Sequence, residues 1–504
     1  MSDPRRFLFA AAAGLLLAAC QQQAQVPSDA SGRKYGSLEF LPCTLTSAHA
    51  SANVGAQCAT LSVPEDPQQP QGRQIPLNIA WIQAAEDGSQ RPDPVFFIAG
   101  GPGQAATEVA SAVAPSLREV LRQRDVFFID QRGTGKSNPL DCRGEDGEPM
   151  PVDTAAQSSL AAIQAYAEAC ARSLQARADT RFYTTTQAIA DLDAVRAALG
   201  VDKVNLIGGS YGTRVAQQYA HRYADHTRAV IIDGVAPNEL VVGGEFANTF
   251  ENAIALQVRQ CQQDAACAKR YPVDTREQLR RLMARVRQAP IEVEYREPGT
   301  AQVQRDTLTA DTISGLAFAF SYVPQTSALL PLVLDEAANG RYEPLMSLAR
   351  MASRQVGDQI NRGMQWSVLC AEDADRYQPA DDGGERLLGP EVAQMFFAAC
   401  KVWNVGSRPD DFTAPFTSQL PVLLLSGELD PVTPPAYAER VLANLGNARH
   451  LVARGQGHGT LGVGCMPKLL DQFLESTDAK ALDASCLEKL VGVPAFTTFN
   501  GWEP

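Results

Sequence analysis

The sequence is short of positive charge and of histidine. Its 504 residues carry 44 lysines and arginines against 57 aspartates and glutamates, which gives a formal net charge of −13. A protein that binds nucleic acid needs a basic surface, so we expect no nucleic-acid partner. No close cysteine pair stands beside a histidine in the spacing of a zinc site. The sequence implies neither a metal nor an organic cofactor.

The N-terminus lacks an apolar run long enough to span a membrane but has the features of an export signal. Arg5 and Arg6 precede the apolar run Phe7–Ala19, which is shorter than the roughly 20 residues of a membrane-spanning helix. Small residues directly before Cys20 are typical of a bacterial lipoprotein signal. We therefore predict that residues 1–19 are removed and that Cys20 is lipidated, with acyl chains such as palmitate. The alternative is an ordinary signal peptide with an incidental cysteine.

The residues after Cys20 predict where the protein resides. Gln21, in place of an aspartate, resembles the pattern that sorts lipoproteins to the outer membrane. We expect an exported lipoprotein on the periplasmic face of a membrane, which this pattern identifies as the outer one. Residues 20–36 are polar and glutamine-rich without an apolar period, which predicts a flexible tether.

The cysteine count agrees with export. The sequence has 11 cysteines, so removing Cys20 leaves an even number, as expected in an oxidising compartment. The spacing suggests that neighbours pair, although spacing alone does not prove connectivity. The suggested pairs are Cys43 with Cys58, Cys142 with Cys170, Cys261 with Cys267, Cys370 with Cys400, and Cys465 with Cys486.

Short apolar runs bounded by glycine turns predict parallel strands that are buried on both faces. These runs occupy residues 95–98, 126–129, 204–207 and 229–232. Between the second and third runs lies a helical stretch whose apolar face is formed by Ile189, Leu192, Val195 and Leu199. The alternation predicts an α/β fold, preceded by antiparallel strands over residues 38–84.

The strand pattern is interrupted and later resumes. Residues from 240 to about 400 are alanine- and glutamine-rich with helical spacing, and apolar runs return at 421–425 and 449–452. A sheet that is interrupted and then completed implies an inserted cap. We predict a first core part over residues 37–238, a mainly helical cap over 239–404, and a second core part over 405–504.

The third apolar run ends in a candidate nucleophile. Gly208-Gly209-Ser210-Tyr211-Gly212 matches G-x-S-x-G, and it stands between a predicted strand and a helical segment, as a nucleophile elbow requires. This context predicts an α/β-hydrolase fold, a mostly parallel sheet flanked by helices. The alternative is a serine in an ordinary loop.

A serine hydroxyl needs a base, and the chain has only 5 histidines. His49 lies before the predicted parallel sheet, and His221 and His226 belong to the helix after the nucleophile and to its exit. His450 begins a predicted strand. His458 stands in a glycine loop directly after the last strand, where this fold places its base, so we predict His458.

The acid should lie between nucleophile and base in the sequence. Asp430 follows the predicted strand at 421–425, and we expect it to orient the imidazole. Glu428 is the rival, and either carboxylate could merely cap a turn or a helix. Thr433, three residues after Asp430, is a candidate for contact with the substrate.

An oxyanion hole needs two backbone N–H groups. We expect one from Tyr211, directly after the nucleophile. The other should come from the glycine loop after the first apolar run, where Pro102 has no N–H. Gly101 is therefore our first choice and Gly103 our second, unless the loop is only a tight turn.

Together these features resemble the proline iminopeptidase and tripeptidyl aminopeptidase family of α/β-hydrolase serine exopeptidases. The motifs that carry the resemblance are Gly100-Gly101-Pro102-Gly103, Asp130-Gln131-Arg132-Gly133-Thr134-Gly135-Lys136-Ser137, the serine elbow, Asp430 and His458. Most of residues 40–500 is included, with a C-terminal segment like that of tripeptidyl aminopeptidases. Ala99 stands where proline iminopeptidases have histidine, and the elbow residue Tyr211 and the many cysteines resemble the tripeptidyl branch. Both observations weaken a strict proline preference.

The resemblance implies an enzyme that removes N-terminal residues from short peptides. Such an enzyme must neutralise the substrate's α-ammonium, because an unpaired buried charge is costly. Glu372 and Asp373, beside the predicted Cys370–Cys400 bridge, are our candidates for that role, with solvated surface acids as the alternative.

Two other functions stay open. A carboxylesterase or lipase could use the same triad, and a non-catalytic binding lipoprotein is disfavoured because serine, acid and histidine are all present in order. The number of residues released, the side-chain preference and the oligomeric state stay open as well.

Overall fold

The computed structural model describes residues 32–47, 53–85, 88–144, 146–150, 159–357, 360–379 and 386–501. The predicted signal peptide, residues 1–19, and Cys20 lie outside the described residues. Within the described ranges, no helix combines the length and the apolar character that a bilayer crossing requires.

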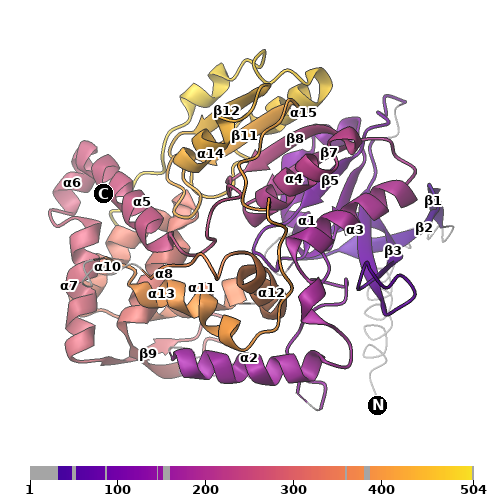
Figure 1. Ribbon diagram of the computed structural model, residues 1–504. Coiled ribbons are helices and arrows are strands. Elements are labelled where there is room, and N and C mark those ends of the chain that lie inside the picture. Colours follow the sequence, from indigo (N-terminus) through magenta and orange to yellow (C-terminus); the bar gives the residue numbers. More distant parts are fainter. Residues whose placement is uncertain are drawn as a thin grey trace, which may run out of the picture.

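A ten-stranded sheet runs through the molecule in the order β1-β2-β3-β4-β6-β5-β7-β8-β11-β12 (Figure 1). Its neighbours are antiparallel from β1 to β6 in this order and parallel from β6 to β12. The strands are β1 (Arg33–Tyr35), β2 (Leu38–Leu45), β3 (Val54–Pro64), β4 (Gln74–Ile82), β5 (Val95–Ile98), β6 (Val126–Ile129), β7 (Val204–Gly209), β8 (Thr227–Asp233), β11 (Val422–Gly427) and β12 (Ala448–Ala453).

The parallel strands form where the sequence predicts them. The apolar runs at 95–98 and 126–129 coincide with β5 and β6, and the later runs overlap β7, β8, β11 and β12. Every residue of β5, β6 and β11 is buried, because helices cover both faces of this part of the sheet. The predicted α/β fold with a mostly parallel sheet is confirmed.

Helices pack on both faces of the sheet. Apolar residues of α3, α4 and α14 share a core with one face, and those of α1 and α15 share a core with the other. The helices are α1 (Ala106–Val113), α3 (Thr185–Ala198), α4 (Tyr211–Arg222), α14 (Pro435–Leu442) and α15 (Met466–Ser476). The predicted apolar face of α3 is buried, since Ile189, Leu192 and Val195 belong to the first of these cores.

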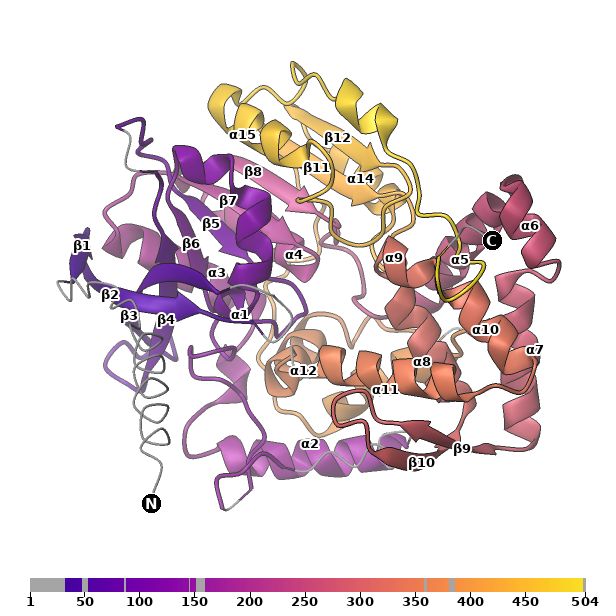
Figure 2. The ribbon, with the colours of Figure 1, turned by 180° about the vertical axis from the view of Figure 1, so that it is seen from behind.

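Between β8 and β11 the chain leaves the sheet and forms a helical insertion, defined here as residues 234–421 (Figures 1 and 2). The hairpin β9 (Ile291–Arg296) and β10 (Val303–Leu308) is antiparallel. The helices are α5 (Phe246–Gln263), α6 (Ala265–Arg270), α7 (Thr275–Gln288), α8 (Ala310–Ser321), α9 (Pro324–Ser327), α10 (Leu330–Ala338), α11 (Glu343–Gly357), α12 (Arg362–Glu372) and α13 (Pro390–Phe397). The insertion has an apolar core of its own, centred on α5, α7, α8 and α10.

Helix α2 (Leu160–Leu174) lies outside the insertion in sequence but packs against α12 and α13 of the insertion (Figure 1). The Ser159 hydroxyl caps it by accepting a hydrogen bond from Ala162 N–H at 3.1 Å. The ring of Tyr166 meets that of Trp366 edge-on, with centroids 6.1 Å apart. The helical layer is therefore built from both sides of the nucleophile in the sequence.

One end of the predicted tether is ordered. Residues 33–35 form strand β1, which pairs with Leu38–Phe40 through a turn at Gly36. Ser37 then donates from its backbone N–H and its hydroxyl to the carbonyl of Ala198, 2.8 Å away in each case. The prediction of a tether through residue 36 is wrong at this end, because cross-strand bonds and the end of α3 fix the chain.

Five disulfides join the neighbouring pairs that the spacing suggests. They connect Cys43–Cys58, Cys142–Cys170, Cys261–Cys267, Cys370–Cys400 and Cys465–Cys486. Disulfides of this kind are typical of proteins outside the reducing cytosol.

Candidate functional site

The carboxyl ends of neighbouring parallel strands bring the predicted residues to one edge of the sheet. Ser210 follows β7, Asp430 follows β11, and His458 follows β12. Only β8 lies between β7 and β11 in the sheet order. Because parallel strands end at a common edge, loops that are far apart in the sequence meet there.

Ser210 occupies a strained turn between β7 and α4. Its φ of 55° and ψ of −126° lie in a region that residues with a side chain rarely adopt. Such a conformation costs on the order of 1–3 kcal/mol and persists only where its surroundings enforce it. The turn places the hydroxyl at the N-terminus of α4, where the helix dipole favours developing negative charge.

Asp430 holds the histidine. The Nδ1 atom of His458 lies 2.7 Å from Oδ2 of Asp430. The other carboxylate oxygen, Oδ1, accepts hydrogen bonds from the backbone N–H groups of Val432 and Thr433 at 2.9 and 2.8 Å. Asp430 is only 2% exposed, so its direction is set by the protein and not by solvent.

Thr433 supports this pair. Its hydroxyl donates to Asp430 Oδ2 at 2.8 Å and lies 3.1 Å from His458 Nδ1. Thr433 therefore contacts both the acid and the base, and its contact with substrate stays a prediction.

The rival acid has another partner. Glu428 accepts a hydrogen bond from the backbone N–H of Gly455 at 2.8 Å. It thereby fixes the start of the loop that carries His458, while Asp430 makes the direct contact with the imidazole.

The remaining described histidines are engaged elsewhere, and His49 lies outside the described residues. His221 faces Asp411 at 3.7 Å, and His226 faces Asp193 at 2.7 Å. Nε2 of His450 lies 2.9 Å from the hydroxyl of Ser426. Ser426 is fully buried, so a substrate cannot reach this hydroxyl.

The imidazole of His458 lies against the backbone at Gly234, next to the residue that binds the serine elbow. Ser210 N–H donates to the carbonyl of Asp233 at 2.9 Å, and Gly234 follows directly. A Cβ atom at Gly234 would lie 3.0 Å from His458 Cε1. The absence of a side chain at Gly234 therefore makes room for the histidine beside the nucleophile's turn.

The charges at the site act on each other. Burial alone would lower the pKa of His458, but the adjacent Asp430 carboxylate and, further off, Asp233 raise it above its usual value. Burial would raise the pKa of Asp430, and the imidazole with the two N–H donors lowers it instead. Asp430 is thus favoured as a carboxylate, and its charge favours the protonated form of the His458 imidazole.

The glycine loop after β5 faces the nucleophile. A Cβ atom at Gly100 would lie 2.9 Å from Cβ of Ser210, so only glycine allows this approach. Gly101 is the next residue in the loop. Tyr211 begins α4, and the first N–H groups of a helix have no partner within the helix. Tyr211 therefore borders Ser210 in the sequence, and Gly101 follows the glycine that approaches the Ser210 side chain.

Glu372 and Asp373 are enclosed within the protein and paired there, which is a correction to the predicted amine-binding role. Both side chains are fully buried. Glu372 accepts from Thr185 N–H at 2.7 Å and from its hydroxyl at 2.9 Å. Asp373 accepts from Arg214 at 3.0 Å and from Arg376 at 2.6 Å. The two acids tie α12 to α3 and α4, and they are not the solvated surface acids of the alternative interpretation either.

Sequence reasoning missed one residue of the insertion that reaches the histidine. The carbonyl of Tyr322 accepts the backbone N–H of His458 at 2.8 Å, and the two rings meet edge-on with centroids 5.3 Å apart. Tyr322 directly follows helix α8, and no local pattern connects it with a loop more than a hundred residues away.

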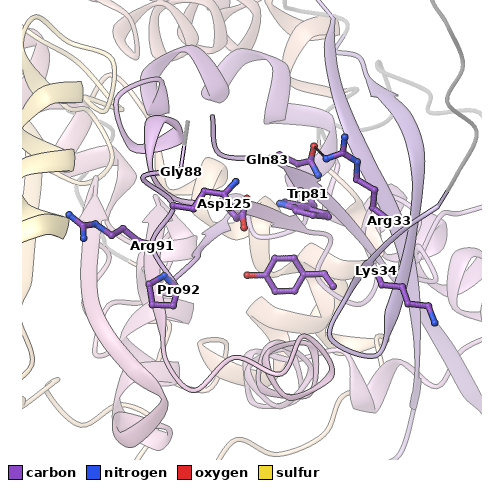
Figure 3. A pocket seen from close by; sticks show the side chains of 10 residues that line it. Arg33, Lys34, Trp81, Gln83, Gly88, Arg91, Pro92 and Asp125 are labelled. Atoms are coloured by element: carbon purple, nitrogen blue, oxygen red, sulfur yellow. Dashed lines mark hydrogen bonds between the residues drawn. The ribbon is translucent and has the colours of Figure 1, made fainter. Parts of the chain in front are cut away.

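A surface pocket of about 900 Å³ lies at the N-terminal edge of the sheet, away from these residues (Figure 3). Its lining is Arg33, Lys34, Tyr35, Trp81, Gln83, Gly88, Gln90, Arg91, Pro92 and Asp125. None of them is a candidate catalytic residue, and the side chains of Lys34 and Arg91 point away from its centre.

The comparisons with known proteins agree with this geometry. The family model described as alpha/beta hydrolase fold matches residues 93–464, so the chain belongs to the α/β-hydrolase family. Among its relatives is the serine protease Hip1 of Mycobacterium tuberculosis, 27% identical over 482 residues that cover 89% of this chain and 91% of that protein.

Two further relatives carry different activities in their names. The tripeptidyl aminopeptidase of Streptomyces coelicolor is 31% identical over 192 residues, which cover 36% of this chain and 35% of that protein. Carboxylesterase B of Mycobacterium tuberculosis is 28% identical over 412 residues, which cover 75% and 76% of the two chains. The resemblance to serine exopeptidases that the motifs indicate is thereby confirmed.

Proposed function

We propose that this protein is a serine exopeptidase that releases N-terminal residues from short peptides, of the tripeptidyl or prolyl aminopeptidase type. The observation that carries the proposal is the 2.7 Å contact between His458 and Asp430 at the sheet edge that also bears Ser210. The similarity to the serine protease Hip1 over nearly the whole chain supports a peptide substrate.

The proposed reaction proceeds through an acyl-enzyme. As Ser210 Oγ attacks the carbonyl carbon of the scissile bond, His458 Nε2 takes its proton, and Asp430 stabilises the resulting imidazolium. The backbone N–H groups of Gly101 and Tyr211 donate to the oxyanion. The imidazolium then gives its proton to the leaving amine, and water hydrolyses the acyl-enzyme by the same route.

The alternative is a carboxylesterase or lipase-type hydrolase that uses the same triad. The similarity to carboxylesterase B favours it, and so does the burial of Glu372 and Asp373, since neither carboxylate is open to a substrate's ammonium group. The whole-length similarity to a protease leads us to prefer the peptidase.

The discriminating experiment compares free and N-acetylated tripeptidyl and prolyl anilides with short nitrophenyl esters, with Ser210→Ala as the control for contaminating activity. A free-amine exopeptidase should prefer the unblocked anilides by at least about tenfold, because an unpaired ammonium loses its binding energy. Equal hydrolysis of blocked anilides, or hydrolysis of esters only, would establish the alternative. Failure of a fluorophosphonate probe to label Ser210 would exclude both and leave a binding lipoprotein.

We also propose that the protein is a lipoprotein anchored through Cys20 to the periplasmic face of a membrane, the outer membrane by the Gln21 pattern. In the sequence, residues 21–32 separate Cys20 from β1, which begins at Arg33. Cells that express the full chain should incorporate a palmitate analogue, and Cys20→Ala should abolish the label. Labelling that survives this substitution would refute the anchor.

The division into a core of residues 37–238 and 405–504 and a cap of residues 239–404 belongs to the same proposal. The core would carry the triad. The cap, whose Tyr322 contacts the histidine loop, would admit only short peptides to the triad.

A further inference from the structure

Asp233 is a buried carboxylate for which the proposed reaction has no role. It ends β8, between the strand that leads to Ser210 and the strand that leads to Asp430, and it is 3% exposed. Oδ2 accepts the backbone N–H groups of Thr460 and Leu461 at 2.5 and 3.0 Å, and Oδ1 accepts the Thr460 hydroxyl at 2.8 Å.

These bonds hold the loop that carries His458. The donors, at positions 460 and 461, follow the histidine almost directly, and the backbone carbonyl of Asp233 accepts Ser210 N–H at 2.9 Å. One residue therefore contacts the nucleophile's turn through its main chain and the base's loop through its side chain.

Asp233 also lacks a cationic partner of the ordinary kind. Among the described residues, no lysine or arginine forms an ion pair with it, whereas buried Asp191 and Asp373 each contact an arginine. A buried carboxylate without a cation is costly. The nearby group that becomes a cation during the proposed reaction is His458.

We propose that Asp233 is a positioning residue that fixes the His458 loop and supplies a second negative charge to stabilise the imidazolium. This inference rests on the proposed function, since it assumes that His458 acts as the base. Asp430 and Thr433 after β11 contact the His458 ring, and the ring of Tyr322 after α8 packs against it. Asp233 at the end of β8 binds Thr460 and Leu461 of the same loop, and its charge acts on His458.

Asp130 offers a matched control. It directly follows β6, is fully buried, and is held by Thr107, Asn78 and the backbone N–H of Lys136 without a lysine or arginine ion pair among the described residues. Burial raises the pKa of Asp130 and of Asp233 alike. Asp130 therefore has the same environment as Asp233 but is not among the groups that act on His458.

The test is the pH dependence of the rate at which a fluorophosphonate probe labels Ser210 in the full chain. In Asp233→Asn the amide oxygen can accept the backbone N–H groups of Thr460 and Leu461, and the amide nitrogen can donate to Thr460 Oγ1. The substitution therefore removes the charge while the loop stays in place. Without that charge His458 loses its proton at lower pH. The ratio of the labelling rate at pH 6 to that at pH 8 should rise about twofold or more.

Two further variants separate charge from shape. Asp130→Asn should leave this ratio at the wild-type value. Asp233→Ala removes the loop's acceptors as well, and labelling should fall by about tenfold or more at every pH. Near-UV circular dichroism checks folding, and an NMR titration of His458, assigned with His458→Gln, should show the same downward shift in Asp233→Asn without reference to activity.

Each outcome decides between the two proposals. A profile of Asp233→Asn that overlays the wild type, with normal labelling of Ser210, would overturn the inference and leave the proposed function standing. Labelling with the shifted profile but without peptide hydrolysis would support the inference and refute only the peptidase. Absence of labelling in the wild type would remove the base and, with it, both proposals.

Discussion

Replacing Glu372 by glutamine should change how the stability of the protein depends on pH. Glu372 is fully buried between Thr185 and Arg214. Burial raises its pKa from 4.5 to about 7, which the Arg214 guanidinium only partly opposes. In the unfolded chain the carboxyl returns to its ordinary value, so folding and ionisation are linked.

The magnitude follows from this difference. Between pH 4.5 and 7 the native state binds a proton that the unfolded chain has lost, so stability falls as the pH rises through this window. Each pKa unit corresponds to about 1.4 kcal/mol, and the whole shift therefore amounts to about 3 kcal/mol. Glutamine cannot ionise, and its amide can accept from Thr185 N–H and donate to the Thr185 hydroxyl.

The assay is urea unfolding followed by tryptophan fluorescence at several pH values from 5 to 8. Relative to wild type, Glu372→Gln should gain up to about 3 kcal/mol of unfolding free energy across this range. The control is Asp375→Asn, because Asp375 lies nearby but is 60% exposed, and Arg408 lowers its pKa. Parallel stability curves for Glu372→Gln and wild type would refute the buried, protonated carboxyl.

The Glu372→Gln variant also tests whether Glu372 binds the substrate's amine. A fully buried carboxylate cannot bind a substrate's ammonium group. The KM of Glu372→Gln for free-amine peptides should therefore stay within about twofold of the wild-type value. A large rise in KM at unchanged stability would restore Glu372 as an amine ligand.

Four further substitutions probe the triad and its surroundings. Asp430→Asn should lower kcat by roughly 10⁴-fold because the imidazole loses its orientation. Glu428→Gln should lower kcat far less. Equal losses of kcat in steady-state assays would contradict the assignment of Asp430 as the triad acid. Thr433→Val removes a hydroxyl bonded to Asp430 and close to His458, and kcat should fall roughly tenfold with KM nearly constant; a change confined to KM would identify a substrate contact. Gly234→Ala should lower the labelling rate of the nucleophile at least about tenfold, because its Cβ would press on the His458 ring.

The control for the last substitution is Gly459→Ala. Gly459 has a positive φ of 89°, as Gly234 has one of 69°, but a Cβ atom there would meet nothing within 4 Å. The two variants share the backbone strain, and only Gly234→Ala adds the collision. Equal effects would attribute the loss to strain alone.

Features that depend on neighbours in the chain could be predicted from the amino-acid sequence. Apolar runs with glycine turns locate β5 and β6 to the residue, because burial on both faces removes the alternation of ordinary strands. The context of strand and helix singles out Ser210, and spacing suggests the cysteine pairs that the disulfides join. Few histidines and a fixed order of triad residues leave little choice for the base.

The partners of each buried acid could not be predicted, because they come from distant parts of the chain. Glu372 and Asp373 are acids beside a disulfide in the sequence, and their burial depends on Thr185 and Arg214, which come from distant helices. Asp233 follows an apolar run like many turn residues, and its contact with the histidine loop arises because β8 and β12 flank β11 in the sheet. The chemistry of a carboxylate is set by its solvation and its partners, and these are properties of the packed molecule and not of the local chain.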